Sequence, residues 1–177
     1  MPHYLEFEVT LEGATPRVWR RFQVHAGAYF VDLHRAIQDA CGWEDYHLYA
    51  FQDDAGTVIA GVPDDEFDRP DPDASAVKLS AFFERVGQSC RYVYDFGDDW
   101  LHDVVLVDRG DPPQRFHRRL IDGARAFPPE DCGGMPGYEE CVAVAQGGED
   151  PGETRAWLGD WDPERFELSP ARAAFDL

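Results

Sequence analysis

Two short segments of the chain gather side chains that could do chemistry. Residues 95–103 hold four aspartates and one histidine, and residues 128–134 read Pro-Pro-Glu-Asp-Cys-Gly-Gly. Carboxylates with an imidazole suit hard or borderline divalent metals, and they also suit general acid–base catalysis. Glycines beside the second pair of carboxylates would let a ligand approach the backbone closely. The candidate ligands for a divalent metal are therefore Asp95, Asp98, His102, Glu130 and Asp131.

A structural interpretation of the same residues stays open. The chain has 35 acidic residues, so some clusters arise by chance, and aspartate and glycine also form turns for local reasons. Arg20 adds to this alternative, because it falls on the apolar side of the alternating segment 17–24 and needs a carboxylate partner or an exit to water there. Glu130, Asp131 or Asp95 could be that partner in a structural ion pair.

Several catalytic classes are excluded by missing motifs. The tripeptide Asp95-Phe96-Gly97 matches the magnesium-binding motif of protein kinases, but the chain has no Gly-rich loop and no His-Arg-Asp segment, and Lys78 is its only lysine. It also lacks the P-loop, the dinucleotide fingerprint, His-Glu-x-x-His and Gly-x-Ser-x-Gly. The acidic neighbours of Cys132 would raise the pKa of its thiol, which argues against a reactive thiolate.

Charge and composition bound the partners. The formal net charge is −19, so the chain repels nucleic-acid backbones, and direct binding of DNA or RNA is not expected. Basic residues still cluster locally at 17–22 and 115–120. No apolar run is long enough to span a membrane, and the first ten residues do not resemble a signal peptide, so the expected location is the cytoplasm. Four cysteines without a Cys-x-x-Cys pair do not suggest a disulfide scaffold.

The elements that must position these residues follow from hydrophobic periodicity. Residues 4–12 and 17–24 alternate as half-buried strands, and residues 30–41 switch to helical spacing with Gly42 as a stop. His34 falls within this helical stripe, either as a core histidine with a backbone partner or as a residue facing a pocket. Strands at 46–52 and 57–61, an exposed loop at 62–76 and a short helix at 81–86 are expected next.

Residues 89–107 predict a β-hairpin that carries the first acidic segment. A two-residue turn at 98–99 would place Asp95 opposite His102, about 5 Å apart between Cβ atoms, and this is the register we favour. A turn at 97–98 would place Asp95 opposite Trp100 instead.

The last third of the sequence predicts an irregular path followed by helices. Residues 120–138 are rich in Gly and Pro, residues 138–146 have helical spacing, and 152–159, 162–168 and the segment from Ser169 predict short helices. The expected fold is α+β, with a mixed, β-grasp-like sheet, one main helix, a second β-hairpin and C-terminal helices. We expect a single domain over 1–177, with 147–177 as a docked helical tail.

Five segments in this order closely resemble the plasmid pRiA4b ORF-3-like family. They are PRVWRRFQV, LHRAIQDACGWEDYHLYAF, YVYDFGDDWLHDVVL, IDGARAFPPEDCGGMPGYEE and DPERFEL. The resemblance covers residues 3 to about 168 and implies an association with mobile elements, but it implies no reaction. The resolvase label that some members carry does not fit a chain with this charge.

The resemblance also implies which residues belong together. The family's motif positions fall here on Trp19, Arg20, His34, Trp43, His47, Tyr94, Asp95, Gly97, Asp98, Trp100, His102, Pro129, Glu130, Asp131, Gly133, Gly134 and Tyr138. Many members carry cysteines where this chain has Leu120 and Phe127, so a thiolate zinc site is not expected.

Three functions fit these observations. The first is a module that binds a small molecule or a protein partner in a pocket lined by Arg20, His34, His47, Asp95, Asp98, Trp100, His102, Glu130 and Asp131. The second is a metal-dependent hydrolase of phosphodiester or similar bonds, and the third is a structural accessory domain without a site. The binding module ranks first because the sequence contains no complete catalytic set.

Overall fold

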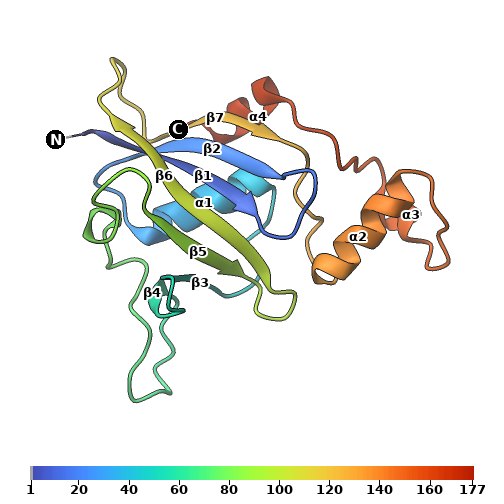
Figure 1. Cartoon of the computed structure of the whole chain (residues 1–177), viewed down its shortest axis with the longest axis horizontal. Coiled ribbons are helices and arrows are strands. Elements are labelled where there is room, and N and C mark those ends of the chain that lie inside the picture. The colour runs from blue at the N-terminus through green and yellow to red at the C-terminus, as the bar shows by residue number, and fades with distance from the viewer. Residues whose placement is uncertain (1) are drawn as a thin grey trace.

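Seven β-strands form one sheet that runs across the molecule in Figure 1. The computed structural model describes residues 2–177. The strands lie in the order β4-β3-β5-β6-β1-β2-β7, and their six pairings are all antiparallel. They are β1 (Tyr4–Leu11), β2 (Trp19–His25), β3 (Tyr49–Gln52), β4 (Val58–Gly61), β5 (Ser89–Tyr94), β6 (Trp100–Gly110) and β7 (Arg118–Ala124).

The helices complete an α+β fold, which confirms the predicted class. They are α1 (Phe30–Cys41), α2 (Gly134–Ala145), α3 (Thr154–Leu158) and α4 (Leu168–Phe175), with a 3-10 turn at Leu79–Ala81. The sheet is antiparallel rather than mixed in strand direction, and an isolated parallel bridge joins Gly61 to Asp73. Among residues 2–177, no helix combines the length and the apolar character that crossing a bilayer requires.

Alternation along β1 sets the two faces of the sheet. Its apolar side chains are at most 2% exposed, and burial of each contributes roughly 1.5–3 kcal/mol (Leu5, Phe7, Val9 and Leu11). On the opposite face, Glu8 bonds Arg17 at 2.6 Å and Arg21 at 2.8 Å. One face of the sheet is therefore core and the other is polar.

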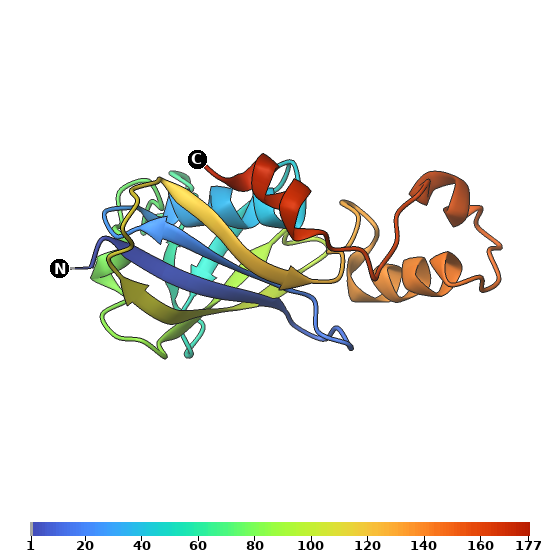
Figure 2. The ribbon, with the colours of Figure 1, turned by 90° about the horizontal axis from the view of Figure 1, so that it is seen from above.

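Helices α1 and α4 lie together against the apolar face (Figure 2). Asp32 accepts the Tyr29 amide at 2.9 Å at the start of α1, and Gly42 ends the helix in the left-handed conformation that glycine tolerates. The Phe30 ring packs 5.0 Å from that of Phe51, between centroids. These bounds of α1 confirm the prediction from spacing.

The helices that follow β7 lie in two different parts of the molecule. Helices α2 and α3 project beyond the end of the sheet in Figures 1 and 2, whereas α4 returns to it. Phe175 of α4 packs 5.4 Å from Phe22 of β2, between ring centroids. A single domain with a docked tail stays a prediction.

Three predicted elements differ from the structure. Residues 118–124, expected to be largely irregular, form β7, where Gly123 leaves room for its neighbours; a Cβ there would lie 2.8 Å from Arg20 Cδ. The helix expected at 81–86 is only the 3-10 turn, because Gln88 Oε1 accepts the amides of residues 84 and 85 and folds the chain back. Residues 162–167 are not helical.

Candidate functional site

The turn between β5 and β6 is five residues long, so the favoured hairpin register is wrong. Tyr94 pairs with Trp100 and Tyr92 pairs with His102, which leaves Asp95 outside the ladder. Asp95 adopts a left-handed backbone conformation (φ 60°), and its Oδ1 accepts the amides of Gly97 at 3.0 Å and Asp98 at 3.2 Å. The Asp95 side chain therefore stabilises the turn through its own hydrogen bonds, and neither of the two-residue turns considered from the sequence (97–98 or 98–99) is formed.

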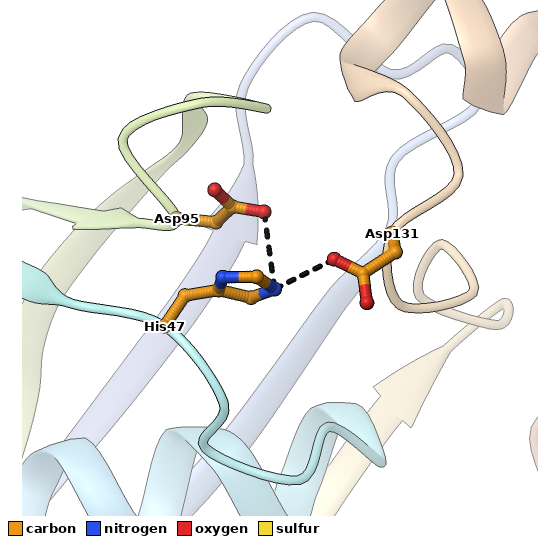
Figure 3. Close-up of side chains that lie close together, drawn as sticks. All are labelled: His47, Asp95 and Asp131. Carbon is orange, nitrogen blue, oxygen red and sulfur yellow. Dashed lines mark hydrogen bonds and ion pairs between the residues drawn. The ribbon is translucent and has the colours of Figure 1, made fainter.

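The turn directs the second oxygen of Asp95 toward a histidine from another segment. His47 Nε2 lies 3.5 Å from Asp95 Oδ2 and 2.6 Å from Asp131 Oδ1, as Figure 3 shows. His47 comes just before β3, Asp95 just after β5, and Asp131 just before α2. The three donor atoms all lie within 4.8 Å of one another. We call these three residues the His47 cluster.

The cluster opens to solvent on one side. The Asp95 side chain is 11% exposed, that of His47 is 31% exposed, and that of Asp131 is 59% exposed. Asp131, like Asp95, has a left-handed backbone (φ 59°), a conformation that costs about 1 kcal/mol or more outside glycine but is tolerated by aspartate. Two such residues at one site fix the directions of two carboxylates toward one imidazole.

The segment that carries Asp131 is held by four hydrogen bonds to neighbouring loops. Glu130 accepts the Tyr94 hydroxyl and, at 2.7 Å, the amide of Glu44. The Trp43 indole donates to the carbonyl of residue 128 at 2.9 Å, and Asp98 Oδ2 accepts the amide of residue 133 at 3.1 Å. Asp98 and Glu130 thus position the cluster from outside it.

Burial and neighbouring charges shift the pKa of His47 in opposite directions. Burial lowers the pKa of its imidazole, but the bond to Asp131 and the negative charges of Asp95, Asp131 and Glu130 outweigh burial and raise it. The imidazolium is therefore favoured in the folded protein. A divalent cation would find the same negative field.

His102 and Trp100, predicted as pocket residues, belong to the core. Trp100 is 1% exposed and His102 is fully buried. Burial lowers the pKa of His102 to about 4, and its Nδ1 lies 3.2 Å from the Tyr92 carbonyl. Of the five predicted metal ligands, the structure therefore brings only Asp95 and Asp131 into the cluster with His47. His102 lies in the core, and Asp98 and Glu130 bond other groups beside the cluster.

Arg20 and His34 also lie away from the cluster. Arg20 is 6% exposed and donates only to backbone carbonyls, so the predicted ion pair with a carboxylate is wrong. His34 is buried with two side-chain partners, Tyr92 at 2.7 Å and Asp45 at 2.7 Å, instead of the backbone partner expected for a core histidine. Both residues stabilise the packing behind the site.

The family motifs predict His47 as a pocket residue but not as a metal ligand. The pairing of β3 with β5 could have indicated this role for His47, because the two strands run antiparallel. The residues before β3 therefore lie beside those after β5, and the Asp95 amide bonds the Leu48 carbonyl at 2.9 Å. The contribution of Asp131 has no such local signal.

Gly134→Ala is expected to lower the free energy of unfolding by about 2 kcal/mol more than Gly147→Ala. Both glycines have a left-handed backbone, but a Cβ at Gly134 would lie 2.7 Å from the Asp98 carbonyl oxygen, whereas at Gly147 it would meet nothing within 4 Å. Urea denaturation of the two variants separates backbone strain from the contact between the hairpin turn and residues 133–134. Equal losses would contradict this contact.

Comparison with known proteins agrees with the sequence motifs. Residues 3–170 match the family described as plasmid pRiA4b ORF-3-like protein. The chain belongs to this family. Every residue of the His47 cluster lies within the matched range, so the cluster is built from the part of the chain that defines the pRiA4b ORF-3-like family.

Two relatives cover nearly the whole chain. The uncharacterized protein y4hQ of Sinorhizobium fredii (strain NBRC 101917 / NGR234) is 34% identical over 97% of this chain and 90% of its own length. The crystal structure of MM3350, a protein of unknown function from Methanosarcina mazei Go1, aligns with a TM-score of 0.80 at 35% identity. That alignment covers 94% of this chain and 96% of MM3350, so MM3350 shares the fold described above.

Proposed function

We propose that this chain is a binding module and that the His47 cluster holds one divalent transition-metal ion. The observation that supports this most directly is the convergence of one imidazole nitrogen and two carboxylates from three loops, with donor atoms within 4.8 Å of one another. Metal bonds of about 2.0–2.2 Å place donors roughly 3–3.6 Å apart. Around an ion, the most widely spaced donors would have to close by about 1 Å, and His47 Nε2 and Asp131 Oδ1, now 2.6 Å apart, would have to separate by less than about 1 Å.

The donor types favour a borderline metal over calcium or magnesium. Ca²⁺ and Mg²⁺ are bound mainly by oxygen, whereas an imidazole with carboxylates suits Zn²⁺, Mn²⁺ or Fe²⁺. In the absence of an ion, the 2.6 Å separation of His47 Nε2 and Asp131 Oδ1 is that of a hydrogen bond, so a metal would replace the shared proton. The exposed Asp131 gives the ion access from solvent.

A metal-dependent hydrolase is the second candidate, and the number of ligands is the observation that favours it. Three protein ligands with open positions are typical of catalytic metal sites, where a bound water is activated as a nucleophile. The nearest additional carboxylate, Glu130, is already bonded by Tyr94 and Glu44, so it is not free to act as a general base. For this reason binding ranks above hydrolysis.

The experiment that tests the proposal is calorimetric titration of chelator-treated protein with Zn²⁺ and Mn²⁺, at several pH values. We expect one ion per chain, and an affinity at least about 100-fold weaker in His47→Gln and Asp131→Asn. Below the raised pKa of His47, affinity should fall about tenfold per pH unit, because the proton and the metal compete for Nε2.

His117→Gln and Asp65→Asn are the matched controls, since both residues are exposed and lie outside the cluster. They should leave the titration unchanged. Absence of binding to the parent protein, together with lower stability of His47→Gln, would overturn the proposal and support the structural accessory domain. Zinc-dependent cleavage of a generic phosphodiester that is lost in His47→Gln would favour the hydrolase.

The proposal also covers the partners of the chain and its location in the cell. A chain at −19 should bind neither DNA nor RNA directly, and we propose that it acts in the cytoplasm on a small molecule or a protein.

A further inference from the structure

A cavity of about 480 Å³ lies at the opposite end of the sheet from the His47 cluster. In Figure 1 this is the end near the N-terminus, where the chain enters β1, leaves β2 and approaches β7. Pairing of Tyr4 with both His25 and Gly110 brings these segments together. The cavity is lined by Pro2, His3, Tyr4, His25, Ala26, Gly27, Arg115, Phe116 and His117.

The lining reverses the charge of the rest of the molecule. Three of the six histidines and Arg115 line the cavity, and none of the described residues that line it is acidic. The His25 and His117 rings meet edge to face, with centroids 5.8 Å apart. In a chain with 35 acidic and 16 basic residues, such a lining offers hydrogen-bond donors and positive charge to an anion.

The wall of the cavity is aromatic. The rings of Tyr4 and Phe116 stack with centroids 4.1 Å apart and an interplanar angle of 23°. The Tyr4 hydroxyl accepts the Phe116 amide at 2.6 Å, which fixes the basic segment 115–117 against β1. An aromatic wall beside donor groups suits a ligand that has a flat apolar part and a charged part.

The charges nearby do not neutralise the site completely. His3 is paired with Asp111, so it contributes less to an incoming anion than the other two histidines. On the far side of His25 and His117, an adjoining hollow is lined by Asp32, Arg35, Arg118 and the C-terminal Leu177, and the two arginines are paired with Asp32 and Asp39. A second hollow, which shares Tyr4 with the cavity, contains Glu6, Asp108, Arg109 and Asp111. These acidic residues line the adjoining hollows and not the cavity itself, so Arg115 and the two imidazoles are the polar side chains that an anion in the cavity would meet.

We infer that this cavity binds a small organic anion that carries a planar ring. The ring would lie against the aromatic pair of Tyr4 and Phe116, and the carboxylate or phosphate would face His25, His117 and Arg115. A volume of about 480 Å³ is in the range of small-molecule sites. The inference goes beyond the proposed metal site and is independent of it.

Calorimetric titration at pH 6.0 with phenyl phosphate tests this inference, with inorganic phosphate and phenol as probes of charge alone and ring alone. We expect phenyl phosphate to bind at least about tenfold more tightly than either probe. Binding should shift the amide resonances of residues 26, 116 and 117 and leave those of residues 47, 95 and 131 in place.

Arg115→Gln, compared with Arg69→Gln, locates the anion. Both arginines are exposed, so neither change should unfold the chain, and only Arg115 lines the cavity. We expect Arg115→Gln to weaken phenyl phosphate about tenfold and Arg69→Gln to have no effect. Equal effects of the two changes, equal affinity for inorganic phosphate, or no binding at millimolar ligand would each overturn the inference. His47→Gln should leave this binding intact, so failure here is distinguishable from failure of the metal proposal.

Discussion

Replacing Arg20 by alanine is expected to lower the free energy of unfolding by about 4 kcal/mol, because a buried side chain is lost and three half-buried carbonyl oxygens lose their donor. Arg20 Nε donates to the Ala40 carbonyl at 3.0 Å, and Nη1 donates to those of Trp19 at 2.8 Å and Ala124 at 3.2 Å. These acceptors belong to α1, β2 and β7. One side chain thus joins its own strand to the following helix and to β7, which lies about 100 residues later.

Aromatic rings, not carboxylates, complete the environment of this guanidinium. Its central carbon lies 4.2 Å from the ring centroid of Phe166 and 5.0 Å from that of Phe127. Burial lowers the pKa of Arg20 to about 10, so the group still carries its charge at neutral pH. Stacking and carbonyl dipoles stabilise a planar cation better than a compact ammonium, so Arg20→Lys should recover less than half of the loss.

Urea denaturation of Arg20→Ala, Arg20→Lys and Arg17→Ala measures this effect. Arg17 is the matched control, because its side chain is 58% exposed and pairs with Glu8 on the polar face of the sheet. A surface pair of this kind contributes less than about 1 kcal/mol. A loss below about 1.5 kcal/mol in Arg20→Ala would show that water or another donor replaces the guanidinium.

The second large effect is a loss of stability in acid that depends on His102. Its Nδ1–H donates to the Tyr92 carbonyl, and its Nε2 is buried with no hydrogen-bond partner among residues 2–177. The rings of Trp43 and Phe127 lie 5.3 Å and 5.9 Å away between centroids. A proton on Nε2 would place an unpaired charge among aromatic side chains, and this burial lowers the pKa to about 4.

The direction of the effect follows from where the proton binds. Above pH 6.5 the imidazole is neutral in both the folded and the unfolded chain, so His102 adds no pH dependence. Between pH 6.5 and about 4 the unfolded chain takes up a proton and the folded chain does not, so stability falls as pH falls. The pKa difference corresponds to about 3 kcal/mol at the lower end of this range.

Chemical denaturation between pH 7.5 and 4 should show this loss in the parent protein and not in His102→Phe or His102→Gln. The comparison is needed because other histidines also contribute: burial of His34 lowers its pKa, and the carboxylates around His47 raise the pKa of that residue. Relative to the variants, the parent should lose about 3 kcal/mol over this range. If the parent and the variants instead differ in stability by the same amount at every pH, the folded state accommodates the proton on His102.

The sequence predicts correctly the strands and helices whose side chains repeat with a regular period. β1 and α1 follow from alternation and helical spacing, and the stop at Gly42 follows from its backbone freedom. β7 was not predicted because its pairing partner, β2, lies about 100 residues earlier in the sequence. A Gly-containing segment has a weak strand signal until a neighbour is present.

The candidate site could be predicted only in part, because it also depends on contacts between distant segments. Asp95 and Asp131 were chosen from residue type, and both lie in the cluster, but the histidine assigned to them depended on hairpin register. The left-handed conformation of Asp95 sets that register, and composition alone does not reveal it. The alternation places Arg20 on the apolar side of its strand and predicts a carboxylate partner or an exit to water. Its partners are instead backbone carbonyls of α1, β2 and β7, which no side-chain pattern predicts.

The origin of the His47 cluster in three distant loops has a consequence for folding. The β5–β6 hairpin that carries Asp95 closes over five residues, whereas the bond between His47 and Asp131 joins positions 84 residues apart. Contacts of such separation carry a larger loop-closure entropy and are expected to form after local ones. The three side chains of the His47 cluster are therefore expected to come together only when the sheet is complete, and the bond between His47 and Asp131 reports that the chain has finished folding.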